Sequence, residues 1–185
     1  MKLIFPNITY KEKAIQFIGE FREHNSAING TGGLDDYLEK STYEKWLKKI
    51  ISEIDIANIP QSKVPALTYF YVREDDNTIV GMVNLRLALN DFLRKEGGHV
   101  GYCIRPTERN THYATDMLGK ALQIYDKLGI KEIILTCDKL NIASANVIKK
   151  CGGKLDSEFY SDAFKEVIER YVIKRQESTH MEGTP

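Results

Sequence analysis

Residues 97–120, GGHVGYCIRPTERNTHYATDMLGK, decide how this chain folds. Over residues 100–104 larger apolar side chains alternate with smaller or polar ones, which is the period of a β-strand. Pro106 ends that pattern and opens a polar turn, and from Ala114 onward the apolar residues fall on one face of a helix. The first N–H groups of a helix have no backbone partners, so this strand, turn and helix predict an anion-binding site.

Gly101 interrupts the predicted strand. An isolated glycine in a strand indicates either a bulge or the close approach of another backbone segment. The helix that follows is expected to end at Gly129 with a left-handed cap, and residues 132–137 then form a buried strand. A strand, a helix and a second strand in this order predict a parallel crossover.

Hydrophobic periodicity on either side of this stretch predicts an α+β fold, with a mixed, mainly antiparallel central sheet and flanking helices. Asp75-Asp76-Asn77 is expected to turn a hairpin, and residues 90–96 are expected to form a loop or a short turn. The other predicted helices cover residues 11–24, 34–54 and 141–151, and the other strands cover residues 1–5, 67–73, 79–87, 154–160 and 166–174.

The chain has 185 residues, enough for one domain with a sizeable core, which is predicted to cover residues 1–174. Residues 175–185 are polar without periodicity and are expected to be a disordered tail. Acidic and basic residues number 26 each, so the absence of net charge gives no case for a nucleic-acid partner. Without a signal peptide or a long apolar run, we expect a cytoplasmic protein with no membrane partner.

The three cysteines have no Cys-x-x-Cys spacing, so neither a disulfide framework nor a zinc site is expected, and no metal is predicted. The sequence also contains neither Gly-x-x-x-x-Gly-Lys-Ser/Thr nor a Gly-x-Gly-x-x-Gly that opens a helix after a strand. These two absences disfavour kinases, P-loop ATPases and dinucleotide-dependent enzymes.

The turn Arg109-Asn110-Thr111-His112-Tyr113-Ala114 resembles the acyl-CoA-binding signature Arg/Gln-x-x-Gly-x-Gly/Ala of the GCN5-related N-acetyltransferases. In that family the signature follows the fourth strand and cradles the pyrophosphate of CoA. The arginine and the alanine match, whereas His112 stands where glycine is usual. The resemblance implies a three-layer α/β/α sandwich, acetyl-CoA as co-substrate, and cofactor contacts from Arg109, Asn110, Thr111, His112, Tyr113 and Ala114.

The side chain of His112 affects how closely the backbone of the loop can approach a phosphate. Glycine has no Cβ in the way and tolerates positive φ, whereas His112 brings a side chain to the same spot. Its ring N–H is able to donate to a phosphate oxygen. We expect binding with altered geometry or weaker affinity, and loss of the cofactor site is the alternative.

A second part of the resemblance is the predicted helix that begins at Asn141, continues through Ser144 and stops near Gly152. In the family such a helix flanks the pantetheine arm of CoA, so Asn141 and Ser144 are expected to line that arm. Ile104 is expected to bind the acyl or pantetheine arm through its backbone. Many family members carry a tyrosine in this helix that protonates the leaving thiolate. The corresponding residue here is Ile148, so the acid is either missing or supplied from elsewhere.

Acetyl transfer to an amine needs a base, because an alkyl ammonium with a pKa of about 10 is mostly protonated at neutral pH. His99 on the predicted central strand is the first candidate, with an ordinary surface histidine as the alternative. Glu158 and Tyr160 are further catalytic candidates, for substrate contact or as the acid. A nucleophilic Cys103 is disfavoured, because no neighbouring base in the sequence would activate it. The N–H of Ile104 or its neighbour is expected to stabilise charge on the thioester carbonyl.

The resemblance therefore predicts an N-acetyltransferase that moves an acetyl group from acetyl-CoA to a small-molecule primary amine by direct attack in a ternary complex. Residues 11–59 and the last two strands are expected to shape the amine pocket. His112 and Ile148 favour one alternative, a non-catalytic acyl-CoA-binding or sensory module on the same fold. An interaction domain without a cofactor is the other alternative. The family resemblance also suggests a homodimer joined at a sheet edge.

Overall fold

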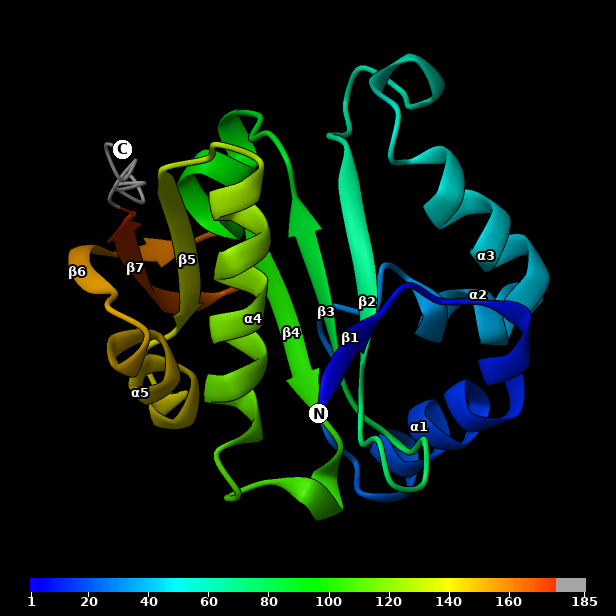
Figure 1. Cartoon of the computed structure of the whole chain (residues 1–185). Helices are drawn as coiled ribbons and strands as arrows, with labels where there is room; N and C mark the ends of the chain where they lie inside the picture. Colours follow the sequence, from blue (N-terminus) through cyan, green and yellow to red (C-terminus); the bar gives the residue numbers. More distant parts are fainter. Residues whose placement is uncertain (176–185) are drawn as a thin grey trace, which may run out of the picture.

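The computed structural model describes residues 1–175, which form two antiparallel sheets with helices on both sides (Figure 1). The first sheet has the order β1 (Lys2–Ile4), β2 (Ala66–Val72), β3 (Ile79–Arg86) and β4 (Val100–Ile104). The second has the order β5 (Glu132–Asp138), β7 (Glu166–Lys174) and β6 (Lys154–Ser161). The helices are α1 (Lys11–Glu23), α2 (Leu34–Lys40), α3 (Tyr43–Ser52), α4 (Tyr113–Lys127) and α5 (Ile142–Lys150).

The helices form a layer on each face of the sheets, so the predicted α+β sandwich is confirmed (Figure 1). Helices α1, α2 and α3 bury an aromatic-rich cluster against β2 and β3, with Trp46 and Phe70 stacked at 5.9 Å between ring centroids. Helix α4 buries a stripe at helical spacing against β3, β4 and α5. The stripe consists of Met117, Leu118, Ala121, Leu122 and Tyr125.

The prediction of one mixed central sheet needs correction at the crossover. Helix α4 connects β4 to β5 as expected, but the two strands belong to separate sheets. Strands β4 and β5 are joined at His99, which lies just before β4. The N–H of His99 donates to the carbonyl oxygen of Ile134 at 2.7 Å. Gly98 precedes this junction with φ +63, a conformation that favours glycine. The division leaves one edge of β4 without a strand partner within residues 1–175.

Three further observations concern element boundaries. The helix predicted over residues 34–54 is two helices, because the chain turns at Ser41 and the hydroxyl of Thr42 accepts from the N–H of Lys45 to cap α3. Residues 90–96, predicted as a loop or a short turn, contain most of a π-helical turn over Leu93–Gly97. The guanidinium of Arg175, the first residue of the predicted tail, binds Asp126, and the rest of that tail lies outside the described residues.

Gly101 marks a close backbone contact. The register of β3 and β4 is continuous around it, so the predicted bulge is wrong. The alternative of a close approach is confirmed: a Cβ added to Gly101 would lie 3.3 Å from the Cα of Gly30, in the loop between α1 and α2. That loop is therefore docked directly on β4, beside the edge left free by the division of the sheets.

No helix within residues 1–175 combines the length and the apolar character needed to cross a bilayer.

Candidate functional site

A cavity of about 540 Å³ opens where β4 ends, between the first turn of α4, helix α5 and the docked loop of residues 24–33. It brings together residues that are far apart in the sequence. All the predicted cofactor residues line it except Thr111, whose hydroxyl donates to the carbonyl oxygen of Glu108 at 2.7 Å. The predicted residues on its wall are Ile104, Arg109, Asn110, His112, Tyr113, Ala114, Asn141 and Ser144.

The free edge of β4 forms one wall of this cavity. The N–H of Arg105 donates to the carbonyl of Val80, and that of Arg86 donates to the carbonyl of His99, both at 2.8 Å. Backbone groups of an antiparallel strand alternate between its two sides, so Tyr102 and Ile104 direct theirs away from β3 and into the gap. The carbonyl of Ile104 accepts from the Nε of Arg109, which leaves the N–H groups of this edge to face the cavity.

The first turn of α4 supplies a second set of N–H donors. His112 is the N-cap of the helix and has φ +63, and its carbonyl accepts from the N–H groups of Thr115 and Asp116. The histidine thus adopts the left-handed conformation that glycine would adopt at this position. A left-handed residue followed by helical ones points successive N–H groups toward one spot, which is a common anion-binding arrangement. The loop keeps this shape despite the missing glycine.

Arg109, which the resemblance predicts to contact the pyrophosphate, lines the cavity and is held there by contacts within the chain. Besides its bond to Ile104, its guanidinium donates to the hydroxyl of Ser26 at 2.7 Å and lies over the ring of Phe21 at 5.6 Å from the centroid. These contacts tie the turn before α4 to the loop that follows α1. Arg109 thus links the end of β4 to the loop after α1, two of the segments that line the cavity.

Helix α5 forms the opposite wall and carries the other predicted motif. The side chain of Asn141 caps it by accepting from the N–H of Ser144 at 3.0 Å. Ile148 is fully buried in the core, so no acid is found at that position.

Tyr102 reaches across the gap, and its hydroxyl forms a hydrogen bond of 2.9 Å with the Oγ of Ser144. Burial raises the pKa of Tyr102 to about 12, so the hydroxyl keeps its proton at neutral pH. Sequence reasoning missed this residue as a functional group, although its place in the strand period already put it on the same face as Ile104.

The structure does not bring His99 to the cavity. Its side chain is only 8% exposed, its ring packs edge-on against Tyr125, and its Nδ1 accepts from the N–H of Ile134 at 2.9 Å. The pKa of His99 is lowered to about 4, mainly by burial and to a smaller extent by the nearby charges of Arg86 and Arg94. The ring joins the two sheets, and nothing in its placement supports the predicted role as base.

The neutral state of His99 gives the fold a pH dependence. Since the folded pKa is about 4 and the ordinary value is 6.5, the unfolded chain binds more protons between these limits, and stability falls as the pH falls through them. We expect this residue alone to remove about 2 kcal/mol of unfolding free energy between pH 7 and pH 5. Urea unfolding of the wild type and of His99→Gln at both pH values measures the difference. Equal losses in the two proteins would contradict the buried neutral ring.

The remaining catalytic candidates also lie away from the cavity wall. Glu158 and Tyr160 are in β6, where Glu158 pairs with Lys139 at 2.8 Å and the side chain of Tyr160 is 58% exposed. Their catalytic roles stay predictions. Cys103 does line the cavity, but burial raises the pKa of its thiol to about 12, so the thiolate needed for a nucleophile is disfavoured.

Residues 19–154 match the family model described as the acetyltransferase (GNAT) domain. No curated protein sequence matches the chain significantly. Among solved structures, the chain resembles the microcin C7 self-immunity acetyltransferase MccE in complex with acetyl-CoA and AMP, with a TM-score of 0.64 and 19% identity over 93% of this chain and 91% of the other.

Two ribosomal-protein acetyltransferases have the same fold. RimL, the ribosomal L7/L12 alpha-N-protein acetyltransferase in complex with coenzyme A, gives a TM-score of 0.66 at 15% identity, over 94% of this chain and 93% of the other. The ribosomal-protein-S5-alanine acetyltransferase from Vibrio fischeri gives 0.63 at 15% identity, over 95% and 92%.

Proposed function

Because this chain belongs to the GNAT acetyltransferase family, we propose that it transfers an acetyl group from acetyl-CoA to a small-molecule primary amine, which attacks directly in a ternary complex. The observation that carries the proposal is the cavity itself, where the free edge of β4, the first turn of α4 and the capped end of α5 converge. These three elements offer donors for a long, polar, anionic ligand. An interaction domain without a cofactor would need none of them.

Different groups of the chain would bind different parts of CoA. The N–H groups at His112, Tyr113 and Ala114 are placed to hold the pyrophosphate of CoA, because they lie at the positive end of a 15-residue helix. The backbone at Ile104 and the side chain of Asn141 lie on the two walls that would flank the pantetheine arm. When bound, acetyl-CoA supplies the activated acyl group as a thioester.

Tyr102 is our candidate for the acid that the family tyrosine would otherwise provide. Its hydroxyl lies in the cavity, holds its proton at neutral pH and is oriented by Ser144. A protonated group at this place is able to donate to a departing thiolate, and the N–H groups of the β4 edge are able to stabilise negative charge on the carbonyl oxygen.

The second candidate function is a non-catalytic acyl-CoA-binding module, which is supported by the placement of the catalytic candidates. His99, Glu158 and Tyr160 all lie outside the cavity wall. Such a module would bind acetyl-CoA but would not turn over. A panel of small amines, assayed by release of free CoA thiol, separates this function from the enzyme, with peptide N-termini as the comparison class of acceptor.

Thermal unfolding with and without acetyl-CoA tests the proposed site, with His112→Gly as the informative variant. Ligand at about 100 times its dissociation constant adds about 2.7 kcal/mol of stability. His112 already has the glycine-like φ of +63, so we expect the variant to stay within about 1 kcal/mol of the wild type without ligand, and to bind acetyl-CoA about threefold or more tightly because the Cβ is gone.

The outcomes of this experiment are distinct. Stabilisation of both proteins supports the site as proposed. Stabilisation of the glycine variant alone would mean that the histidine side chain closes the site. If acetyl-CoA stabilises neither protein, the proposed function is wrong.

A further inference from the structure

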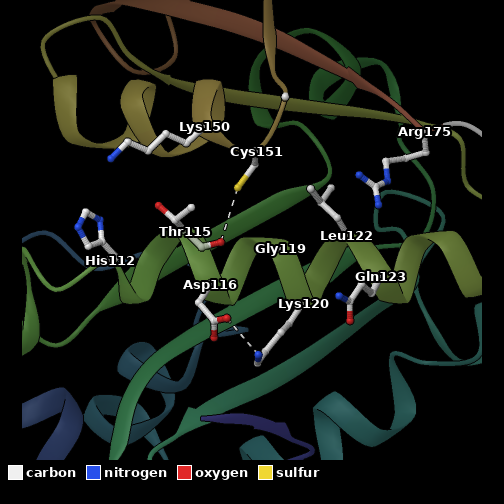
Figure 2. Close-up of a pocket in the computed structure, with 11 residues that line it drawn as sticks. His112, Thr115, Asp116, Gly119, Lys120, Leu122, Gln123, Lys150, Cys151 and Arg175 are labelled. Atoms are coloured by element: carbon white, nitrogen blue, oxygen red, sulfur yellow. Dashed lines mark hydrogen bonds and ion pairs between the residues drawn. The ribbon is translucent and has the colours of Figure 1, made fainter.

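A second hollow, of about 730 Å³, lies on the outer side of α4, between this helix, the end of α5 and Arg175 (Figure 2). His112, Thr115 and Lys150 line both this hollow and the proposed acetyl-CoA cavity. The two spaces therefore meet at the first turn of α4. A ligand held at that turn and too long for the cavity would continue into the hollow.

Most charged groups in the hollow are already matched by a partner. Arg175 donates to both carboxylate oxygens of Asp126, at 2.8 and 2.6 Å. Lys120 pairs with Asp116 at 3.1 Å (Figure 2), and the same carboxylate accepts from the hydroxyl of Tyr71. An anionic ligand gains little from charges that are neutralised in this way.

Lys150 is different from these charged residues. It is the last residue of α5, and it forms no ion pair with any other residue of the described chain, 1–175. Figure 2 shows its side chain extending toward His112 and Thr115, over the junction of the two spaces. The preceding Lys149 points elsewhere, with its Nζ over the ring of Tyr171 at 5.6 Å. One of two neighbouring lysines is thus left to face the passage between the cavity and the hollow.

We infer that Lys150 binds the 3′-phosphate of CoA and makes the site selective for CoA over its 3′-dephosphorylated form. The inference rests on the proposed function, which places the pyrophosphate at the first turn of α4. The ribose that follows the pyrophosphate carries the 3′-phosphate, a dianion close to the point where the ligand leaves the cavity. The unmatched ammonium of Lys150 lies at that point, with the hydroxyl of Thr115 below it (Figure 2).

Calorimetric titration with CoA and with 3′-dephospho-CoA tests the inference on the wild type, Lys150→Ala and Lys149→Ala. We expect the wild type to bind CoA about fivefold to tenfold more tightly, the size of a charge-assisted contact at a partly exposed site. Lys150→Ala should reduce that preference to about twofold by weakening CoA alone. Lys149→Ala removes the same charge from the same helix and should keep the wild-type preference. Lys150→Arg should keep it as well.

Each of the other possible titration results contradicts a different part of the inference. Equal weakening of both ligands by Lys150→Ala would place the lysine at the pyrophosphate and reject its assignment to the 3′-phosphate. The same loss of preference in Lys149→Ala would show a general charge effect. Equal affinity of the wild type for both ligands would refute the selectivity but leave the proposed function intact. If neither CoA nor 3′-dephospho-CoA binds to the wild type or to His112→Gly, the proposed function is refuted together with the inference.

Discussion

Replacing Tyr102 with phenylalanine is expected to lower kcat for acetyl transfer by about a hundredfold or more, which is the usual contribution of a general acid. The Kd for acetyl-CoA should change by less than about twofold, because the hydroxyl contacts Ser144 and the ring stays in place. Steady-state kinetics with an amine from the panel, together with a binding titration, gives both numbers.

Two further variants show whether the effect belongs to an acid. Ser144→Ala removes the partner that orients the hydroxyl and keeps the hydroxyl itself, so we expect a loss of about fivefold in kcat. Tyr10→Phe is the matched control, because it deletes a hydroxyl that lies near Asn77, remote from the cavity. If Tyr102→Phe keeps kcat within twofold of the wild type, the acid is another group.

Gly30→Ala is expected to destabilise the fold by about 3 kcal/mol or more. The added Cβ would lie 2.3 Å from the carbonyl oxygen of Gly101 and 2.5 Å from the Cα of Tyr102, and both are backbone atoms that cannot rotate away. Gly30 also has φ +73, which a side chain disfavours. Urea unfolding measures the loss. Since the docked loop forms part of the cavity wall, acetyl-CoA binding should weaken as well.

Gly19→Ala provides the control for this substitution. Gly19 lies within α1, and a Cβ there would meet nothing within 4 Å. Alanine is the better helix former, so this variant should gain about 0.5–1 kcal/mol. A Gly30→Ala protein as stable as the wild type would show that the loop does not rest on β4 as described.

The sequence was informative about this protein wherever the signal is local. Strand and helix periods depend on the spacing of apolar residues along one segment, so they located β4, the turn and α4 together with the order of most other elements. The turn signature also singled out His112 as the residue standing where glycine is usual, and the backbone is left-handed at that residue.

The elements whose prediction failed depend on contacts that no single segment contains. Residues 34–54 have continuous helical spacing, yet they form two helices that fold onto β2 and β3 around Trp46. Strand β4, helix α4 and strand β5 follow one another in the order that predicts two parallel, paired strands. Whether such strands form a ladder depends on packing on both faces, and here the pairing stops at His99.

By itself, then, the sequence determined the fold class and the family signature, because these follow from the spacing of residues within single segments. The resemblance named eight of the residues that line the cavity. Only the tertiary structure decided what the side chains do. Tyr102 and Ser144 are 42 residues apart, and Arg109 and Ser26 are 83 apart. The packing of separate elements brings Tyr102 to Ser144 across the gap and Arg109 to Ser26. Burial, which shifts the pKa of Tyr102 and His99, exists only once those elements have met.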